Sequence, residues 1–356
     1  MAWRHFPVTF LSLCLAGCAV GPDYQPAQPQ TPARWNDPGD ASVKSRATPQ
    51  AVNPRWWTTF NSPQLNSLIE RAIAGNLSLQ QTVLRIAGAR EQINQAGGAF
   101  LPAVNGSLQA TRQQLGLEGE LKSHDVYGQL ENADPAVSGA LGALTQPVNL
   151  YQGSFDAQWE LDLWGKVRRQ VEATTAQQQQ AIEQRNDALV SLEAEVARAW
   201  LQLRGAQSII ASLNTQIQSA QETLTLTQNR QQGGLSPQLD VENARAQAAN
   251  LEAQLPQYQA QERQAMNALA VLLGKTPGAL DSELRGTQPL PALPDVVPTG
   301  IPSTLARRRP DVREAEATLH AATAQIGVSV AQLCPSLTLS GQFGLRNSET
   351  NWLTDW

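Results

Sequence analysis

The stretch "FDAQWELDLWGKVRR", residues 155–169, combines two different structural signals. Its first nine residues alternate between apolar side chains and the polar Asp156, Gln158, Glu160 and Asp162, which is the pattern of a β-strand with two unlike faces. Gly165 follows, and the chain continues in residues that favour helices. The sequence therefore predicts an amphipathic strand that leads directly into a long helix.

The helix predicted after this strand has a heptad pattern. From Ile182 onwards apolar residues recur every seven positions, with a second series three places behind, as in a coiled coil. A helix of about 65 residues, from 168 to 232, would be on the order of 100 Å long. The run stops at Gly233-Gly234-Leu235-Ser236-Pro237, and a second heptad run follows. Residues 168–273 are therefore predicted to form one antiparallel helical hairpin.

Two parts of the chain resemble each other when residues 72–109 are laid on residues 305–342. Six identities occur at this offset of 233 positions, and each copy reads as a helix, a proline and an alternating strand. One strand follows Pro102 and the other follows Pro335. The chain is therefore expected to contain a tandem duplication and three strands in all.

The N-terminus predicts export. Residues 1–17 have a basic start, an apolar centre and a small-residue end, which are the features of a secretory signal peptide. The last residues before Cys18 resemble a bacterial lipobox, which implies that Cys18 is acylated; a plain signal peptide is the alternative. Ala19, by resemblance to bacterial sorting rules, favours the outer membrane. Residues 18–62 are rich in proline and are expected to form an extended tether.

Catalysis and nucleic-acid binding find little support in the sequence. The formal charge of −5 argues against nucleic acid as the main partner. The histidines and cysteines show no metal-ligand spacing, and no nucleophile–base pair is evident. Asp156, Glu160 and Asp162 line a regular strand face, where solvated carboxylates are expected. We therefore predict no catalytic residue, no metal and no cofactor.

The alternating strand allows two interpretations. It fits the half-buried strand of a soluble antiparallel sheet, and it also fits a strand of a membrane β-barrel, for which roughly 9–11 alternating residues are expected. Three such strands, the predicted outer-membrane anchor and a long Gly-containing loop over 113–150 favour the barrel.

Four longer stretches carry a family resemblance: "WELDLWGKVRR" (159–169), "GGLSPQLDVENARAQ" (233–247), "ALAVLLGKTPG" (268–278) and the segment 301–341. With these stretches the chain resembles the outer membrane factor family, the TolC-like and NodT-like channels of tripartite efflux pumps. The resemblance implies a mainly α fold with membrane β-strands, in which a homotrimer builds one twelve-stranded outer-membrane β-barrel and a hollow periplasmic α-barrel. It implies a passive conduit for small molecules, working with a periplasmic adaptor and an inner-membrane transporter.

The resemblance also assigns roles to residues. The strand 155–164 would cross the outer membrane with Asp156, Glu160 and Asp162 toward the lumen. The adaptor would dock at the hairpin tip, on Gly233, Gly234, Leu235, Ser236 and Asp240.

The resemblance further divides the chain into a first repeat over 63–300 and a shorter second repeat over 301–356. The family's fourth strand and second hairpin have no counterpart before Trp356, so a C-terminally truncated member is expected. The alternative function is a periplasmic adaptor lipoprotein, which also combines an acyl anchor with a helical hairpin. The duplicated helix, proline and strand argue against it.

Overall fold

The computed structural model describes residues 19–28, 30–32, 35, 45–113, 123 and 147–347. The predicted signal peptide, Cys18 and most of the loop over 113–150 lie outside these residues. The chain divides into two compact units, and each is described by itself. The first unit comprises Met1–Asp23, Ile93–Glu172 and Thr323–Trp356, and the second comprises Tyr24–Gln92 and Ala173–Ala322.

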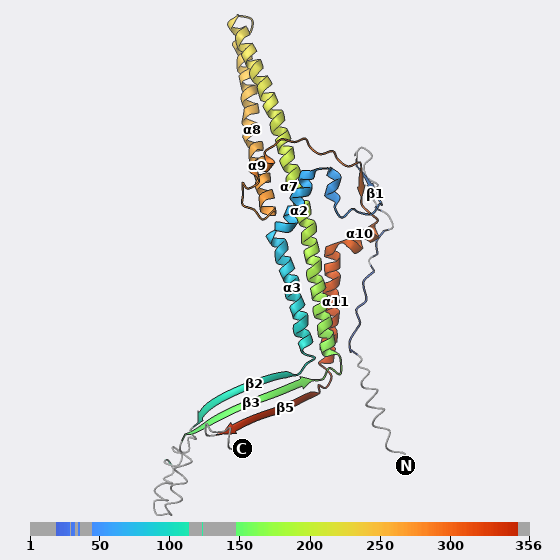
Figure 1. Cartoon of the computed structure of the whole chain (residues 1–356). Coiled ribbons are helices and arrows are strands. Elements are labelled where there is room, and N and C mark those ends of the chain that lie inside the picture. The colour runs from blue at the N-terminus through green and yellow to red at the C-terminus, as the bar shows by residue number, and fades with distance from the viewer. Residues whose placement is uncertain are drawn as a thin grey trace, which may run out of the picture. The chain divides into compact units, whose positions relative to one another are not determined.

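The first unit contains an antiparallel sheet of three strands (Figure 1). β3 (Val148–Glu160) lies in the centre, between β2 (Ala103–Gln113) and β5 (Thr338–Asn347). The three predicted strands are therefore confirmed. β3, however, begins at Val148 rather than at residue 155, and it ends at Glu160 rather than at residue 164.

The early end of β3 corrects the prediction for Asp162. After Glu160 the backbone turns, with a 2.9 Å hydrogen bond from the amide of Leu163 to the carbonyl of Leu161. Asp162 therefore lies beyond the strand, and its carboxylate accepts hydrogen bonds from the amides of Val167 and Arg168 at 3.0 and 3.2 Å. The first amides of a helix have no partner within the helix. Asp162 supplies an acceptor for two of them and does not extend the strand.

The second unit contains a long helical hairpin. α7 (Lys166–Gln232), whose first turns belong to the first unit, runs antiparallel to α8 (Gln238–Leu272) (Figure 1). Gln221 of α7 donates a 2.7 Å hydrogen bond to Glu252 of α8 across the pair. The predicted hairpin over 168–273 is confirmed, and so is its turn at 233–237.

The hydrophobic core of the second unit surrounds the base of this hairpin. It joins α7 and α8 to α2 (Pro63–Gly75) and to the short α9 (Asp281–Leu284). Six leucine or isoleucine residues and one valine in it are completely inaccessible to solvent, and burial of this kind is the dominant stabilising term in folding. They are Leu65, Leu68, Ile69, Leu203, Leu269, Leu284 and Val196.

The predicted duplication appears in the bounds of two helices. α3 (Leu77–Gly98) and α11 (Pro310–Ala331) both have 22 residues, and a shift of 233 positions lays one on the other. Each is followed by a strand, β2 or β5, and these two strands pair with opposite edges of β3. The two copies thus occupy equivalent places in the sheet of the first unit.

The segment predicted as a tether is not free of the body. β1 (Arg46–Thr48) pairs in parallel with β4 (Val296–Pro298), and the indole of Trp35 donates a 2.9 Å hydrogen bond to the carbonyl of Gly300. The 3-10 helix η1 (Trp56–Phe60) buries Trp57 in the core. The described residues of the predicted tether over 18–62 thus contact distant parts of the chain through backbone and aromatic groups.

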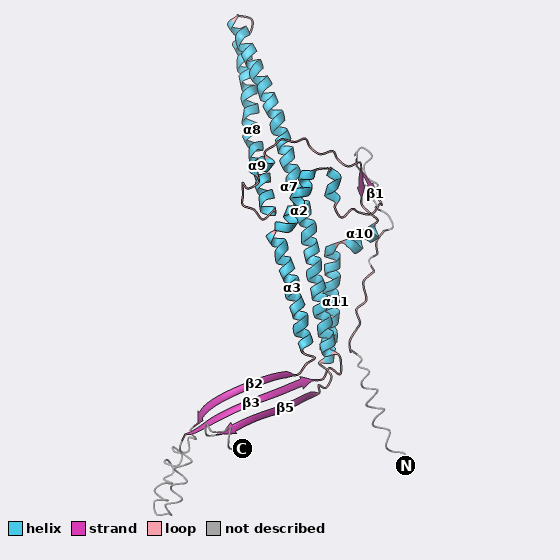
Figure 2. Cartoon of the chain, in the orientation of Figure 1, coloured by secondary structure: helices cyan, strands magenta, loops and turns pink. Residues whose placement is uncertain are grey.

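A further ion pair joins α11 to α7 in the second unit. Arg313 of α11, the helix that follows α10 (Pro302–Arg308), contacts the buried Glu183 of α7 at 2.7 Å. Figure 2 shows how strongly helices dominate the chain. Among the residues that the structure describes, no helix is long and apolar enough to cross a membrane.

Candidate functional site

The sheet of the first unit has one polar and one apolar face. Residues that lie opposite each other in an antiparallel pair share a face, so the register assigns every side chain: Asp156, for example, lies opposite Asn105 and Gln342. The polar face carries Asn105, Ser107, Gln109, Thr111, Gln152, Ser154, Asp156, Gln158, Glu160, Ser340 and Gln342, with Val148 and Leu150 at the start of β3. The apolar face carries Val104, Leu108, Ala110, Tyr151, Phe155, Ala157, Trp159, Leu339, Phe343 and Leu345, with Arg112 and Asn149 at the end of the sheet where β3 starts.

The apolar face is exposed. Leu108 is 88% accessible, Phe343 67% and Phe155 63%. On the opposite face, by contrast, the hydroxyls of Ser107 and Ser154 are hydrogen-bonded to each other at 2.8 Å, and Ser154 is buried. The sheet therefore presents a continuous hydrophobic surface across three strands, backed by a hydrogen-bonding one.

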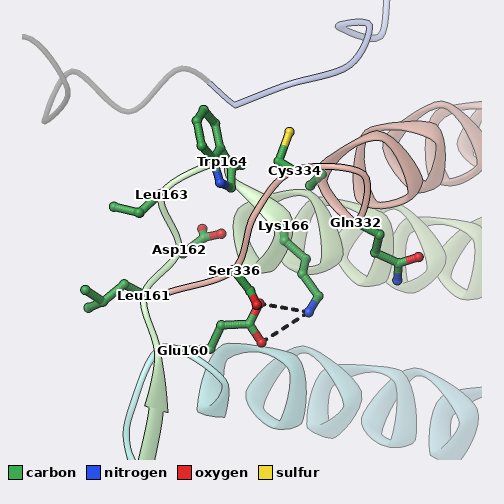
Figure 3. Close-up of a pocket in the computed structure, with 10 residues that line it drawn as sticks. Glu160, Leu161, Asp162, Leu163, Trp164, Lys166, Gln332, Cys334 and Ser336 are labelled. Carbon is green, nitrogen blue, oxygen red and sulfur yellow. Dashed lines mark hydrogen bonds and ion pairs between the residues drawn. The ribbon is translucent and has the colours of Figure 1, made fainter. Parts of the chain in front are cut away.

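The predicted acidic strand residues separate into two groups. Asp156 and Glu160 both lie on the polar face of β3. Asp162 does not, because it accepts hydrogen bonds from the start of α7. Glu160 also forms an ion pair with Lys166, the first residue of α7, at 3.0 Å (Figure 3). The predicted lumen-facing set is therefore reduced to Asp156 and Glu160.

Aromatic side chains mark the end of the sheet next to α7. The indole of Trp159 donates a 3.0 Å hydrogen bond to the carbonyl of Phe100, and the indole of Trp164 donates one of 2.8 Å to the carbonyl of Pro335. Both rings remain partly exposed. Trp164 and Cys334 line the small pocket drawn in Figure 3, together with Glu160, Asp162 and Lys166. Indoles of this kind are typical of the boundary between lipid and water.

The hairpin tip is a Schellman motif, the commonest glycine-dependent end of a helix. Gly234 has a left-handed φ of +70°, its amide donates to the carbonyl of Gln231 at 2.9 Å, and the amide of Leu235 donates to the carbonyl of Arg230 at 2.8 Å. The two hydrogen bonds satisfy carbonyls that α7 leaves open at its end. The sequence signal, a pair of glycines between two heptad runs, located this turn correctly.

The predicted tip residues lie together on the surface. Leu235 is 74% exposed, and Ser236 donates a 2.6 Å hydrogen bond to the carboxylate of Asp240. Asp240 is in the first turn of α8, where a negative charge interacts favourably with the helix dipole. The tip thus offers an exposed apolar side chain beside small and acidic ones.

The described residues show no candidate metal site, because no group of three or more His, Cys, Asp or Glu residues among them could hold a metal ion. Cys334 is a free, partly buried thiol. Cys18, the predicted lipidation residue, lies outside the described residues.

Sequence reasoning missed one residue of the first unit altogether. The guanidinium of Arg169, only 5% exposed, contacts Asp23 at 2.6 Å and Glu172 at 2.8 Å. Asp23 and Arg169 are 146 positions apart, so periodicity gives no signal for this pair.

Comparisons with known proteins agree with this architecture. Residues 68–275 match the family model "Outer membrane efflux protein". Nodulation protein T of Rhizobium leguminosarum bv. trifolii is 33% identical over 96% of this chain and 67% of its own length. The toluene efflux pump outer membrane protein TtgF of Pseudomonas putida is 32% identical over 98% of this chain and 69% of its own.

Solved structures give the same result. The outer-membrane channel OprN superposes with a TM-score of 0.76 at 32% identity, covering 94% of this chain and 69% of its own. The open state of the Neisseria gonorrhoeae MtrE outer membrane channel gives a TM-score of 0.70 at 26% identity, with 94% and 68% covered.

Proposed function

The chain belongs to the family of outer membrane efflux proteins, and from this premise we propose that it is a channel component of a tripartite efflux system. In this role it is a passive conduit for small molecules across the periplasm and the outer membrane. The observation that carries the proposal is the three-stranded sheet, with its exposed apolar face and its polar opposite face.

The sheet fits a membrane wall better than a water-exposed surface. Leaving apolar area in water costs roughly 25 cal/mol per Å², whereas the same face is favourable against lipid. In lipid every backbone polar group must be paired within the protein. Among the described strands, β2 and β5 each pair only with β3. Strands from further copies would complete the pairing, which supports a homotrimer closed into one β-barrel.

The hairpin supplies the periplasmic part of the conduit. Its helices are long, and the tip offers the exposed Leu235 between Gly234 and Ser236. Small residues permit close approach of another backbone, and an exposed leucine offers an apolar contact. A periplasmic adaptor docking on this tip would connect the channel to the inner-membrane transporter that supplies the energy.

The anchor of this channel is proposed to be lipid on Cys18. Two or more acyl chains give stable membrane attachment where one gives only marginal binding. Metabolic labelling with palmitate should mark the wild-type chain and should fail for Cys18→Ala. Equal label in both proteins would contradict lipidation at this residue and would leave the channel proposal untouched.

A matched pair of neighbouring substitutions tests the membrane sheet. Leu108 points to the apolar face of β2, and Gln109, the next residue, points to the polar face. An arginine on a lipid-facing strand costs about 2–4 kcal/mol at the bilayer centre, so Leu108→Arg should reduce the amount of membrane-inserted protein at least fivefold. Gln109→Arg should leave that amount unchanged.

The measurement is the amount of protein in purified outer membranes that resists extraction with urea. Equal reduction by both arginines, or by neither, would contradict a lipid-facing apolar surface. The relative TtgF is described as an outer membrane protein of an efflux pump, which favours a channel over the periplasmic adaptor considered as the alternative.

A further inference from the structure

Ala19–Asp23, the residues that follow Cys18, are held by hydrogen bonds to other parts of the first unit. We call Ala19–Asp23 the strap. The amide of Val20 donates a 3.1 Å hydrogen bond to the carbonyl of Trp164, at the turn between β3 and α7. Arg169 holds the strap from the other side: its guanidinium donates to the carbonyl of Val20 at 3.2 Å, to that of Gly21 at 3.4 Å, and to the carboxylate of Asp23 at 2.6 Å.

Arg169 is also held by a contact within its own helix, independent of the strap. Its remaining nitrogen donates to Glu172, one turn along α7, at 2.8 Å, and the residue is 5% exposed. Hydrogen bonds to Glu172 and Asp23 raise the pKa of the guanidinium above its ordinary value. A buried arginine whose three guanidinium nitrogens are all hydrogen-bonded is a rigid, charged clamp rather than a mobile surface side chain.

Three glycines allow the strap to come this close. A methyl group on Gly21, whose φ is +92°, would lie 2.5 Å from the Cα of Gly327. One on Gly165, with φ +77°, would lie 2.7 Å from the Cα of Ala19. One on Gly327 would lie 2.8 Å from the side chain of Arg169. Larger residues would hold the strap away. We call Gly165, Gly327 and Arg169, which lie outside the strap and contact it, the seat.

We propose that the seat makes the lipid anchor a depth gauge: it holds Ala19 at the turn between β3 and α7, so that lipid on the adjoining Cys18 sets how deeply the sheet inserts. The inference rests on the proposed lipidation of Cys18. Only one peptide unit, about 3.8 Å, separates Cys18 from the seated Ala19. A flexible Gly/Ser-like tether of the length of residues 18–62 would instead permit a mean separation of roughly 37 Å.

The chemistry of the seat agrees with a place at the membrane surface. Trp164 and Trp159, both partly exposed, are near it in the sequence and lie at the same end of the sheet. Indoles prefer the headgroup level. The charged Arg169 lies in the first turns of α7, beyond the apolar face of the strands.

The test introduces slack without altering the seat. Inserting Ala-Ser-Gly-Ser between Cys18 and Ala19 keeps an alanine directly after the cysteine and keeps every strap residue. The insertion adds up to about 14 Å of chain. Depth is read in isolated outer membranes from the reaction of a cysteine at Leu108 with a water-soluble maleimide, in a Cys334→Ser background. A cysteine at Gln109, on the polar face, serves as the reference.

The expected result is at least a threefold faster reaction at position 108 in the protein with slack, with an unchanged rate at 109. Palmitate label should be equal in both proteins. Equal rates at position 108 with equal label would overturn the depth gauge and leave lipidation standing. Absence of label from the wild-type chain would overturn lipidation and the depth gauge together.

A second variant removes the clamp instead of adding slack. Arg169→Lys keeps the positive charge but cannot make the forked contacts with Val20, Gly21 and Asp23, and it should raise the rate at position 108 in the same way. The matched control is Arg245→Lys, in an exposed ion pair with Glu242 on α8, which should change nothing. Equal rates in Arg169→Lys and Arg245→Lys would count against the clamp.

Discussion

The carboxylate of Asp162 and the backbone amide of Val167 are joined by a 3.0 Å hydrogen bond. A second bond, of 3.2 Å, joins the same carboxylate to the amide of Arg168. These contacts convert the end of a strand into the start of a 67-residue helix within five positions. Asp162 therefore lies in neither β3 nor α7, but in the turn that connects them.

The first prediction concerns this cap. Asp162→Ala removes the acceptor for two amides that have no partner inside α7, and loss of a helix cap typically costs about 0.5–2 kcal/mol. We expect a reduction of about 1 kcal/mol in the free energy of unfolding, measured by urea denaturation in detergent. Asp162→Asn should recover most of it. A similar loss in Asp156→Ala, on the strand, would show that the effect is not due to capping.

The second prediction concerns pH. Glu193 on α7 is 8% exposed, and burial raises its pKa from 4.5 to about 7, with attraction to Arg185 acting in the opposite direction. Between these values the folded chain holds a proton that the unfolded chain has released, so stability falls as pH rises from about 4.5 to about 7. The total effect is on the order of 1–3 kcal/mol.

Glu193→Gln should remove this dependence and should make the protein more stable than wild type at pH 8. The comparison is a series of thermal unfolding curves at pH 5, 6, 7 and 8. Glu195→Gln, an exposed neighbour on the same helix, is the control and should follow the wild type. A wild-type unfolding temperature that rises from pH 5 to pH 8 would contradict the predicted loss of stability and refute its assignment to Glu193.

The third prediction concerns a buried arginine in the core of the second unit. Arg204 is completely inaccessible; its guanidinium donates to Gln207 and to the carbonyl of Gly286, both at 2.6 Å, and also to Gln64. Burial lowers its pKa. Arg204→Met removes the donor to the side-chain oxygen of Gln207 and to the carbonyl of Gly286, whereas Gln64 keeps a hydrogen bond from the indole of Trp200. Each buried group left without a partner costs about 1–3 kcal/mol.

We therefore expect Arg204→Met to lower the free energy of unfolding by about 3 kcal/mol, measured by urea denaturation. Arg245→Met, in an exposed ion pair, should cost less than about 1 kcal/mol because such pairs contribute little. Equal losses in the two variants would mean that the Arg204 contacts carry no special weight.

The fourth prediction separates the two glycines of the tip. Gly234 has a φ of +70° with open space where a side chain would be, whereas Gly233 has no such φ. Gly234→Ala should therefore cost about 1 kcal/mol through backbone strain alone, and Gly233→Ala should cost little. The helical signal at 222 nm during thermal unfolding reports both. A larger loss in Gly233→Ala would contradict the Schellman geometry.

The fifth prediction tests the tip as a docking surface. Gly234→Trp places a large ring beside Leu235 and should abolish efflux in a complementation assay, with normal amounts of the protein in the outer membrane. Gly234→Ala introduces the same strain without the bulk and should retain efflux. Unchanged efflux in the tryptophan variant would count against adaptor binding at this turn.

Local patterns predicted the elements of this fold. A period of seven gave α7 and α8, a period of two gave β2, β3 and β5, and a glycine pair gave the turn between the long helices. These features depend on neighbours within a few positions, because backbone geometry repeats at fixed intervals along a helix or strand. The offset of 233 even placed α3 on α11, since both copies keep the same local order.

Only the tertiary structure decided which residues act together. Asp162 continues the alternation of its strand in sequence, yet the unpaired amides of α7 recruit it as a cap. The strap reads as a proline-rich tether, yet Arg169, distant in sequence, seats it. Arg204 lies on a heptad helix, where no sequence pattern indicates that it is fully buried. The sequence determined periodicity and turns; burial and long-range pairing were decided by the tertiary structure, because desolvation and hydrogen bonding depend on neighbours that folding alone brings close.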